Sequence, residues 1–168
     1  MHNVFVLIAA CILLFNTSAC YSFRGISIPD GAERVAIDVF TDNALNAPPT
    51  LALEATEELR NKVRDEARLL IVEDTPDLEF VGTLVDFRVT AEAPQPGEFA
   101  ALNKLTIVVL IEYTNHMDEN DEGWRQNFSF DFPFPGSTTL VSVQDEAIED
   151  ILDNITEQIF NKAFTDNW

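Results

Sequence analysis

The stretch LEFVGTLVDFRVT, Leu78 to Thr90, decides the fold, because its large apolar residues alternate at the period of two that is typical of a β-strand. The alternation predicts one face with Leu78, Phe80 and Leu84, and an opposite face with Val81, Val85, Phe87 and Val89. Gly82 interrupts the pattern, which indicates either a bulge or a close contact with the backbone. The sequence therefore predicts a long strand here.

Two further long strands follow. Leu102 to Tyr113, after a Pro- and Gly-containing loop at residues 91–100, predicts a face with Leu105, Ile107, Val109, Ile111 and Tyr113, while Val108 and Leu110 lie on the opposite face. Asn115 to Gly123 is an acidic hairpin tip. The returning strand, Trp124 to Phe132, places Trp124, Phe128, Phe130 and Phe132 on one face. The three strands therefore form a meander, and Val108 and Leu110 need a cover if helices lie on one side only.

Two helices are predicted around this meander. Thr50 is a candidate N-cap for a helix to about Arg68, with a stripe of mostly small residues that allows close packing on a sheet: Ala52, Ala55, Leu59, Val63 and Ala67. The second helix is expected to begin at Ser142 or Val143 with Asp145 and Glu146 in its first turn. Its apolar stripe consists of Ile148, Ile151, Leu152, Ile155, Ile159 and Phe160.

Shorter strands complete the prediction. Arg34 to Phe40 alternates as a first strand, residues 41–49 form a loop, and Leu69 to Glu73 forms a short strand after the first helix. The expected fold is α+β, with a mixed four- to five-stranded sheet, two helices packed on one face and the order β-α-β-β-β-β-α. We expect one domain over residues 33–168.

The chain begins with a short apolar run, VFVLIAACILLF from Val4, which ends in small residues before Cys20. The run is too short to span a bilayer and indicates a removable signal over residues 1–19. Cys20 then follows the pattern of a lipoprotein, with lipid on its thiol and residues 20–32 as a tether that packs onto the domain. Thr17 departs from the aliphatic residue usual three positions earlier, and no Lys or Arg precedes the run.

Two alternatives to Cys20 stay open. Ile8-Ala9-Ala10-Cys11 also fits a lipoprotein cleavage site, although it would leave an apolar run of about seven residues. The other alternative is a plain secreted or non-exported chain. Both cysteines lie at or before the expected cleavage site, so no disulfide is expected in the mature protein.

The chain is strongly acidic, with 10 Lys and Arg against 29 Asp and Glu and a formal net charge of −19. Because nucleic acids are bound largely through cations, this balance argues against a nucleic-acid partner. Arg60, Lys62, Arg64 and Arg68 are clustered but alternate with acidic residues. They indicate either a helix surface with ion pairs or a site of anion contact.

The residues do not indicate an enzyme. The hairpin tip resembles the start of a calcium loop, but the twelfth position, which should supply a bidentate Glu, is Ser129. His116 is the one histidine after the signal, and no nucleophile elbow occurs. The carboxylates of the last helix indicate a solvated face. We therefore expect no catalytic residues, no metal site and no cofactor beyond covalent lipid on Cys20.

Several short segments together resemble the LptE family of lipopolysaccharide-assembly outer-membrane lipoproteins. They are Cys20-Tyr21-Ser22-Phe23, Ser27-Ile28-Pro29, Leu78-Glu79-Phe80, Asn103-Lys104-Leu105-Thr106-Ile107, Trp124 with Gln126, Phe128-Ser129, and Ile159 to Phe164 with Asn167-Trp168. Their order and the order of the predicted elements carry the resemblance, which covers nearly all of the mature chain.

The resemblance implies a non-enzymatic lipoprotein on the periplasmic side of the outer membrane. It would plug and stabilise the LptD β-barrel and assist insertion of lipopolysaccharide into the outer leaflet. Family members contact lipopolysaccharide through basic residues, for which the candidates here are Arg60, Lys62, Arg64, Lys104 and Arg125. Val108 and Leu110 are the candidate barrel-partner face. The alternative is a generic periplasm-facing lipoprotein that serves as an envelope protein-protein interaction module.

Overall fold

The computed structural model describes residues 25–92 and 101–165, and within them six strands form one mixed sheet. The long strands β4 (Leu78–Glu92), β5 (Leu102–Asn115) and β6 (Trp124–Pro135) form the predicted antiparallel meander. The short strands are β1 (Arg34–Ile37), β2 (Thr41–Asp42) and β3 (Leu70–Ile71). Strand β1 lies between β3 and β4 and is parallel to both, and β2 pairs with β4 in parallel.

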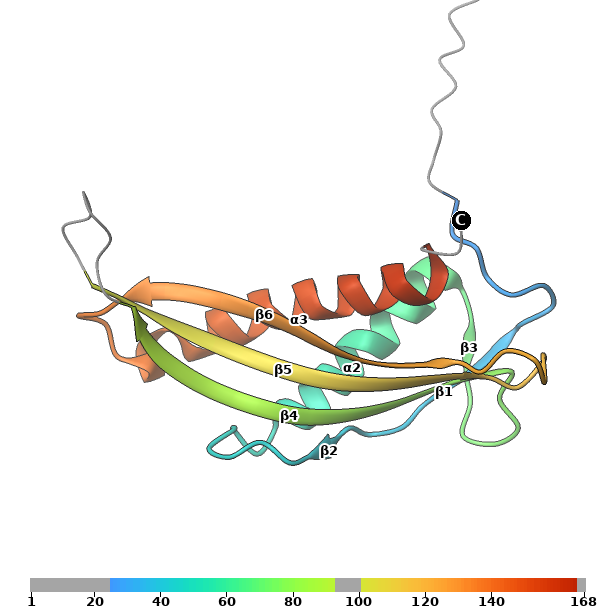
Figure 1. Ribbon diagram of the computed structural model, residues 1–168, viewed down its shortest axis with the longest axis horizontal. Helices are drawn as coiled ribbons and strands as arrows, with labels where there is room; N and C mark the ends of the chain where they lie inside the picture. Colours follow the sequence, from blue (N-terminus) through green and yellow to red (C-terminus); the bar gives the residue numbers. More distant parts are fainter. Residues whose placement is uncertain (1–24, 93–100, 166–168) are drawn as a thin grey trace, which may run out of the picture.

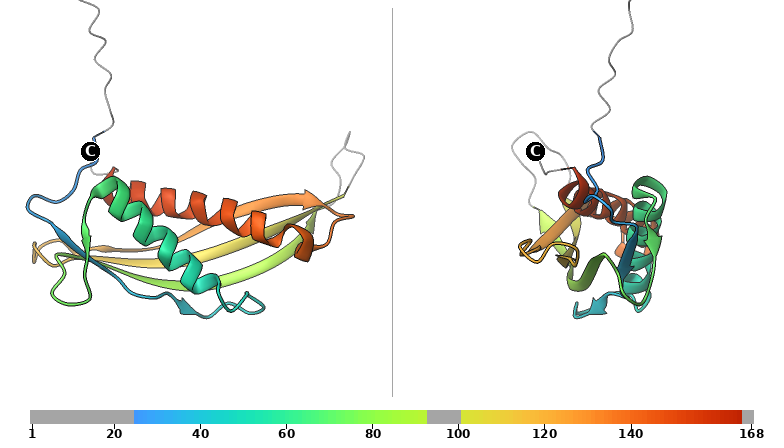
Figure 2. Two further views of the ribbon diagram at one scale, coloured as in Figure 1. Left: turned by 180° about the vertical axis from the view of Figure 1, so that it is seen from behind. Right: turned by 90° about the vertical axis from the view of Figure 1, so that its right-hand side faces the viewer.

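Both helices cover the same face of this sheet, and the opposite, uncovered face carries no helix of the described residues (Figures 1 and 2). Helix α2 (Leu51–Lys62) continues as a π-helical turn, Val63–Ala67, and ends where Arg68 adopts a left-handed backbone with φ of 57°. Helix α3 (Leu140–Phe164) is the longer of the two. The predicted α+β class and one-sided helix layer are confirmed. The predicted number of strands, four to five, was too low because the two residues of β2 were assigned to a loop.

Helix α2 packs with the predicted stripe of mostly small residues facing inward, and all five members of that stripe are buried. Thr56 donates a hydrogen bond to the carbonyl of Ala52 and accepts one from the backbone N–H of Phe40, at 3.0 Å. Arg60 donates from Nε to the carbonyl oxygen of Ile37, at 2.9 Å. These bonds join α2 to the chain that leaves β1.

Helix α3 places its predicted apolar stripe against the sheet, and every residue of that stripe is buried. At the C-terminal end of α3, Phe164 meets Phe80 with ring centroids 6.1 Å apart, and Phe80 meets Tyr113 at 5.0 Å. Burial is the main reason why the pKa of Tyr113 is raised to about 12. The backbone N–H of Ser27 donates to the carbonyl of Phe164 at 2.7 Å, so the start of the described chain is bound at this end.

The predicted faces of β4 are partly wrong, because a bulge lies between Leu84 and Asp86. Val85 is the extra residue, so the side chains that follow it switch faces. Phe87 pairs with Ile107 and is buried, 6% exposed, on the helix side instead of the uncovered side, and Val89 pairs with Leu105 on that same side. Strictly alternating residues on both sides of Val85 conceal the extra residue in the sequence.

The predicted start of the second helix, Ser142 or Val143, is also wrong, by two or three residues. Helix α3 begins at Leu140, so Asp145 and Glu146 lie beyond its first turn. Thr139 occupies the N-cap position without a side-chain hydrogen bond to the helix backbone. Leu140 and Val141 are apolar, but the polar residues Thr139 and Ser142 flank them, so this short run was not recognised as part of the helix.

Candidate functional site

The uncovered face of the sheet is the first candidate surface. Residues opposite each other in antiparallel strands point to the same face, so the register defines the rows across it. The central rows, from β4 through β5 to β6, are Val81, Glu112 and Arg125; Thr83, Leu110 and Asn127; and Asp86, Val108 and Ser129. Val81 is 41% exposed, and Val108 and Leu110 are half-buried. The predicted pair thus lies on the face that no described helix covers.

Ion pairs stand at both ends of this face. Arg125 donates from Nε to Glu112 Oε1, at 2.9 Å. At the opposite end, Lys104 Nζ lies 3.1 Å from Glu92 and 3.2 Å from Asp131, and these carboxylates raise the pKa of Lys104, with Glu92 contributing most. Lys104 and Arg125 therefore flank the apolar centre of the face, each beside an acidic partner.

The cations of α2 and of the π-helical turn after it lie on the other side of the sheet, and each binds partners within the fold. Arg60 binds the carbonyl of Ile37 and also pairs with Glu57, at 2.8 Å. Lys62, whose side chain is 15% exposed, pairs with Glu66 at 2.8 Å and with Glu157 of α3. Arg64 donates to the side-chain oxygen of Asn61, at 3.1 Å. The structure therefore separates the five predicted cations into two groups on opposite faces.

Burial is the largest single influence on the pKa of Lys62, and it lowers this pKa because it disfavours the charged form. The hydrogen bonds to Glu157 and Glu66 together outweigh the effect of burial. The pKa of Lys62 is accordingly raised, and its hydrogen bond lowers the pKa of Glu157. This cation connects the two helices.

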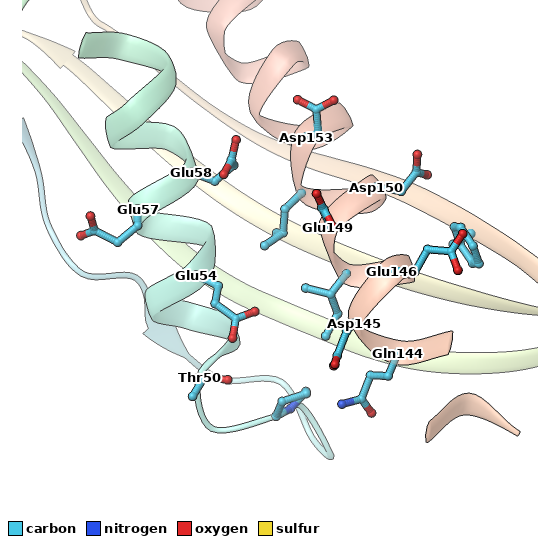
Figure 3. A pocket seen from close by; sticks show the side chains of 14 residues that line it. Thr50, Glu54, Glu57, Glu58, Gln144, Asp145, Glu146, Glu149, Asp150 and Asp153 are labelled. Atoms are coloured by element: carbon cyan, nitrogen blue, oxygen red, sulfur yellow. The ribbon is translucent and has the colours of Figure 1, made fainter. Parts of the chain in front are cut away.

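A groove of about 940 Å³ between α2 and the first half of α3 is the second candidate (Figure 3). Its walls carry eight carboxylates: Glu54, Glu57, Glu58, Asp145, Glu146, Glu149, Asp150 and Asp153. Ile148 and Leu152 contribute apolar surface between them. In Figure 3, Glu57 points away from α3, while Glu146 and Asp150 point away from α2. The sequence indicated the acidic face of α3. It did not indicate that α2 lies beside this face, because the two helices are far apart in the chain and meet only in the tertiary structure.

These carboxylates do not converge. Within residues 25–92 and 101–165, no group of three or more His, Cys, Asp and Glu side chains is arranged to hold a metal ion. The helices of the same ranges include none that is long and apolar enough to cross a membrane.

The carboxylates of the acidic hairpin tip accept hydrogen bonds from backbone N–H groups of the same turn. Asp118 Oδ1 accepts the backbone N–H of Asn120 at 2.9 Å, and Asp121 Oδ1 accepts that of Gly123 at 2.9 Å. The first of these bonds is the main reason why the pKa of Asp118 is lowered. Gly123 has a φ of 63°, and a Cβ on it would stand 2.2 Å from the carbonyl oxygen of Tyr113. The carboxylates therefore stabilise the turn.

A family model described as LptE, lipopolysaccharide-assembly, matches residues 32–163. The chain belongs to the LptE family. The resemblance seen in the sequence is thereby confirmed over nearly the whole described domain. The LptE family is a non-enzymatic family of lipopolysaccharide-assembly lipoproteins, which assigns this chain to outer-membrane assembly. Cys11 and Cys20 lie outside the described residues.

Several solved structures are similar to this member of the LptE family. A minor lipoprotein from Acinetobacter baumannii aligns with a TM-score of 0.48 and 8% identity, over 78% of this chain and 91% of its own. A hypothetical protein from Chlamydia trachomatis aligns with a TM-score of 0.47 and 9% identity, over 79% of this chain and 93% of its own. The lipoprotein B of Nitrosomonas europaea aligns with a TM-score of 0.46 and 13% identity, over 81% of this chain and 88% of its own. A comparison with curated protein sequences found no match.

Proposed function

We propose that this LptE-family chain is held by lipid on Cys20 at the periplasmic side of the outer membrane, where it plugs and stabilises an LptD-like β-barrel. Its role is that of a non-enzymatic component of lipopolysaccharide export, which assists insertion of the glycolipid into the outer leaflet. The uncovered sheet face, with Val108 and Leu110 at its centre, packs against the barrel wall.

The one-sided helix layer carries this proposal. A sheet normally buries both faces or keeps one face polar, whereas here Val81, Val108 and Leu110 interrupt the polar side. Exposed apolar patches rimmed by polar residues usually mark interaction sites. The rim includes Thr83, Asn127 and Ser129, which suit the polar lumen-facing wall of a membrane barrel.

Lipopolysaccharide contact is a second role, supported by the position of two cations. Lys104 and Arg125 lie on the uncovered face at opposite ends of its apolar centre. An anionic glycolipid headgroup can compete with the partly exposed carboxylates that now pair with them. Arg64, in the π-helical turn after α2, is a further candidate contact, while Arg60 and Lys62 are engaged in bonds that hold α2 in place.

The barrel-plug role is tested by co-purification of the lipidated chain with the LptD-like protein of the same cell, carrying an affinity tag. Leu110→Glu and Val108→Glu place a charge at the centre of the uncovered face. Each should reduce recovery with the barrel roughly tenfold or more, because an unpaired charge in a desolvated contact is costly.

Val141→Glu is the matched control. Val141 is 86% exposed on α3, so this substitution introduces the same charge on the opposite side of the sheet. This variant should co-purify like the unchanged chain. Full recovery of a folded Leu110→Glu variant, verified by circular dichroism, would exclude the proposed contact. Failure of the unchanged chain to co-purify would instead favour a different envelope partner.

A further inference from the structure

Strand β6 is an edge strand. It pairs with β5 along its whole length, and in the described part of the chain no strand pairs with its other side. Its residues from Arg125 to Asn127 are exposed, as are Ser129 and Asp131. Long edge strands present unpaired backbone groups that another strand can bind.

The direction of those backbone groups follows from two observations. The N–H of Gly136 donates to the carbonyl of Ala101 at 2.8 Å, in the same register as the rest of the β5–β6 pairing. Even-numbered residues of β6 therefore bond to β5, because bonded and outward positions alternate along a strand. Pro133 and Pro135, which have no N–H, occupy the outward positions, as expected of an edge.

The outward set before these prolines is Arg125, Asn127, Ser129 and Asp131. Each of the four directs both its N–H and its C=O away from β5, since the register has no break along β6. The prolines limit further pairing on one side, and the hairpin tip limits it on the other. This leaves a segment with a defined length and register.

Charge selects the kind of strand that fits. Helix α3 packs beside β6, and its Glu146 and Asp150 point away from α2 in Figure 3. With a formal net charge of −19, a second copy of this chain would be repelled. A strand with basic side chains would instead be attracted.

We propose that the edge of β6 from Arg125 to Asp131 binds an extended, basic segment of a partner polypeptide as an added β-strand. The main-chain hydrogen bonds supply the affinity, and the carboxylates of α3 select cationic side chains. This contact is independent of the barrel-wall proposal, which uses the side chains of the sheet face.

The probe is a blocked, fluorescent peptide of about eight alternating Lys and Val residues, long enough to pair with the outward positions. Asn127→Pro removes one outward N–H and places a ring where the added strand would lie. Binding measured by fluorescence anisotropy should weaken roughly tenfold. Asn127→Ala is the matched control, because it keeps the N–H, and its affinity should stay within about twofold.

A second measurement leaves the protein unchanged. The same peptide with N-methyl groups on alternate residues cannot donate from one edge and should bind more weakly by a similar factor. In the unmodified complex, amide hydrogen exchange should slow selectively at Arg125, Asn127, Ser129 and Asp131. A peptide with Glu in place of Lys should not bind.

Three results would overturn the proposal. Equal affinity for Asn127→Pro and Asn127→Ala would exclude backbone pairing, as would tight binding of the N-methylated peptide. Protection that maps to Glu54 and Glu149 instead of β6 would assign the peptide to the groove between the helices. Self-association of the chain through β6 in sedimentation experiments would identify a second copy as the occupant.

Discussion

The ring of Phe40 lies against the backbone of Gly82, where a Cβ would stand 2.3 Å from Phe40 Cδ1. Phe40 is 4% exposed, so its ring has little space into which it can move. The glycine is thus required by close contact, and the bulge lies three residues later.

Gly82→Ala should destabilise the fold by about 1–3 kcal/mol, because the added methyl overfills a packed site. Chemical denaturation measures this loss. Gly25→Ala is the control, since nothing lies within 4 Å of a Cβ there, and it should be nearly neutral. Trimming the ring with Phe40→Leu in the Gly82→Ala background should recover part of the loss. Strict additivity of the two changes would contradict the contact.

Asp77 should make the fold sensitive to acid. Its carboxylate accepts bonds from the Arg34 guanidinium at 2.7 Å and from the backbone N–H groups of Arg34 at 2.9 Å and Glu33 at 3.1 Å. These bonds lower the pKa of Asp77 from 3.8 to about 2. The hydrogen bond from the Arg34 side chain contributes most to this shift, followed by that from the N–H of Glu33.

Because the unfolded chain binds this proton more readily, the stabilisation is fully present above pH 3.8 and is lost as the pH falls through about 2. Asp77→Asn should lower stability at neutral pH and flatten its pH dependence between these values. Denaturation midpoints measured across this range provide the test. Asp74→Asn, in the neighbouring exposed turn, should leave the dependence in place. An unchanged acid profile in Asp77→Asn would argue against this assignment.

The pair formed by Lys62 and Glu157 should couple α2 to α3. Glu157 is half exposed, so the coupling energy in a double-mutant cycle with Lys62→Met and Glu157→Gln should be roughly 0.5–1 kcal/mol. Denaturation at low and high salt measures it, and the coupling should decrease as salt increases. A coupling near zero at low salt would show that Lys62 acts only through its packing near the Phe160 ring.

Lipid attachment at Cys20 predicts that Cys20→Ser releases the chain from the outer membrane. Cys11→Ser should leave both anchoring and the mature mass unchanged, because Cys11 would be removed with the signal. Membrane fractionation and mass spectrometry of the mature N-terminus measure the two effects. A mature chain that begins at Cys11 would reverse the assignment.

Much of the fold could be predicted because burial repeats with a regular period. The apolar residues of β5 and of both helices recur at steps of two, three and four, and all of those assigned to the core are buried. The prediction failed where a single residue broke the period, at Val85, where only two residues formed a strand, Thr41 and Asp42, and at the start of α3. None of these features changes the composition enough to be recognised.

The candidate site was less predictable, because it depends on which elements meet. Val108 and Leu110 could be assigned to a face from alternation alone, but Val81 joins them only through the β4–β5 register. Arg60 and Lys62 have the same charge in the sequence, yet one binds a strand carbonyl and the other a second helix.

The two helices, the three long strands, the buried sides of the helices and of β5, the acidic charge and the family could all be inferred from the amino-acid order, because each is encoded locally or in that order. Tertiary structure decided the parallel placement of β1 between β3 and β4, the ion-pair partners and the free edge of β6. These depend on contacts between residues far apart in the chain, which no local period specifies.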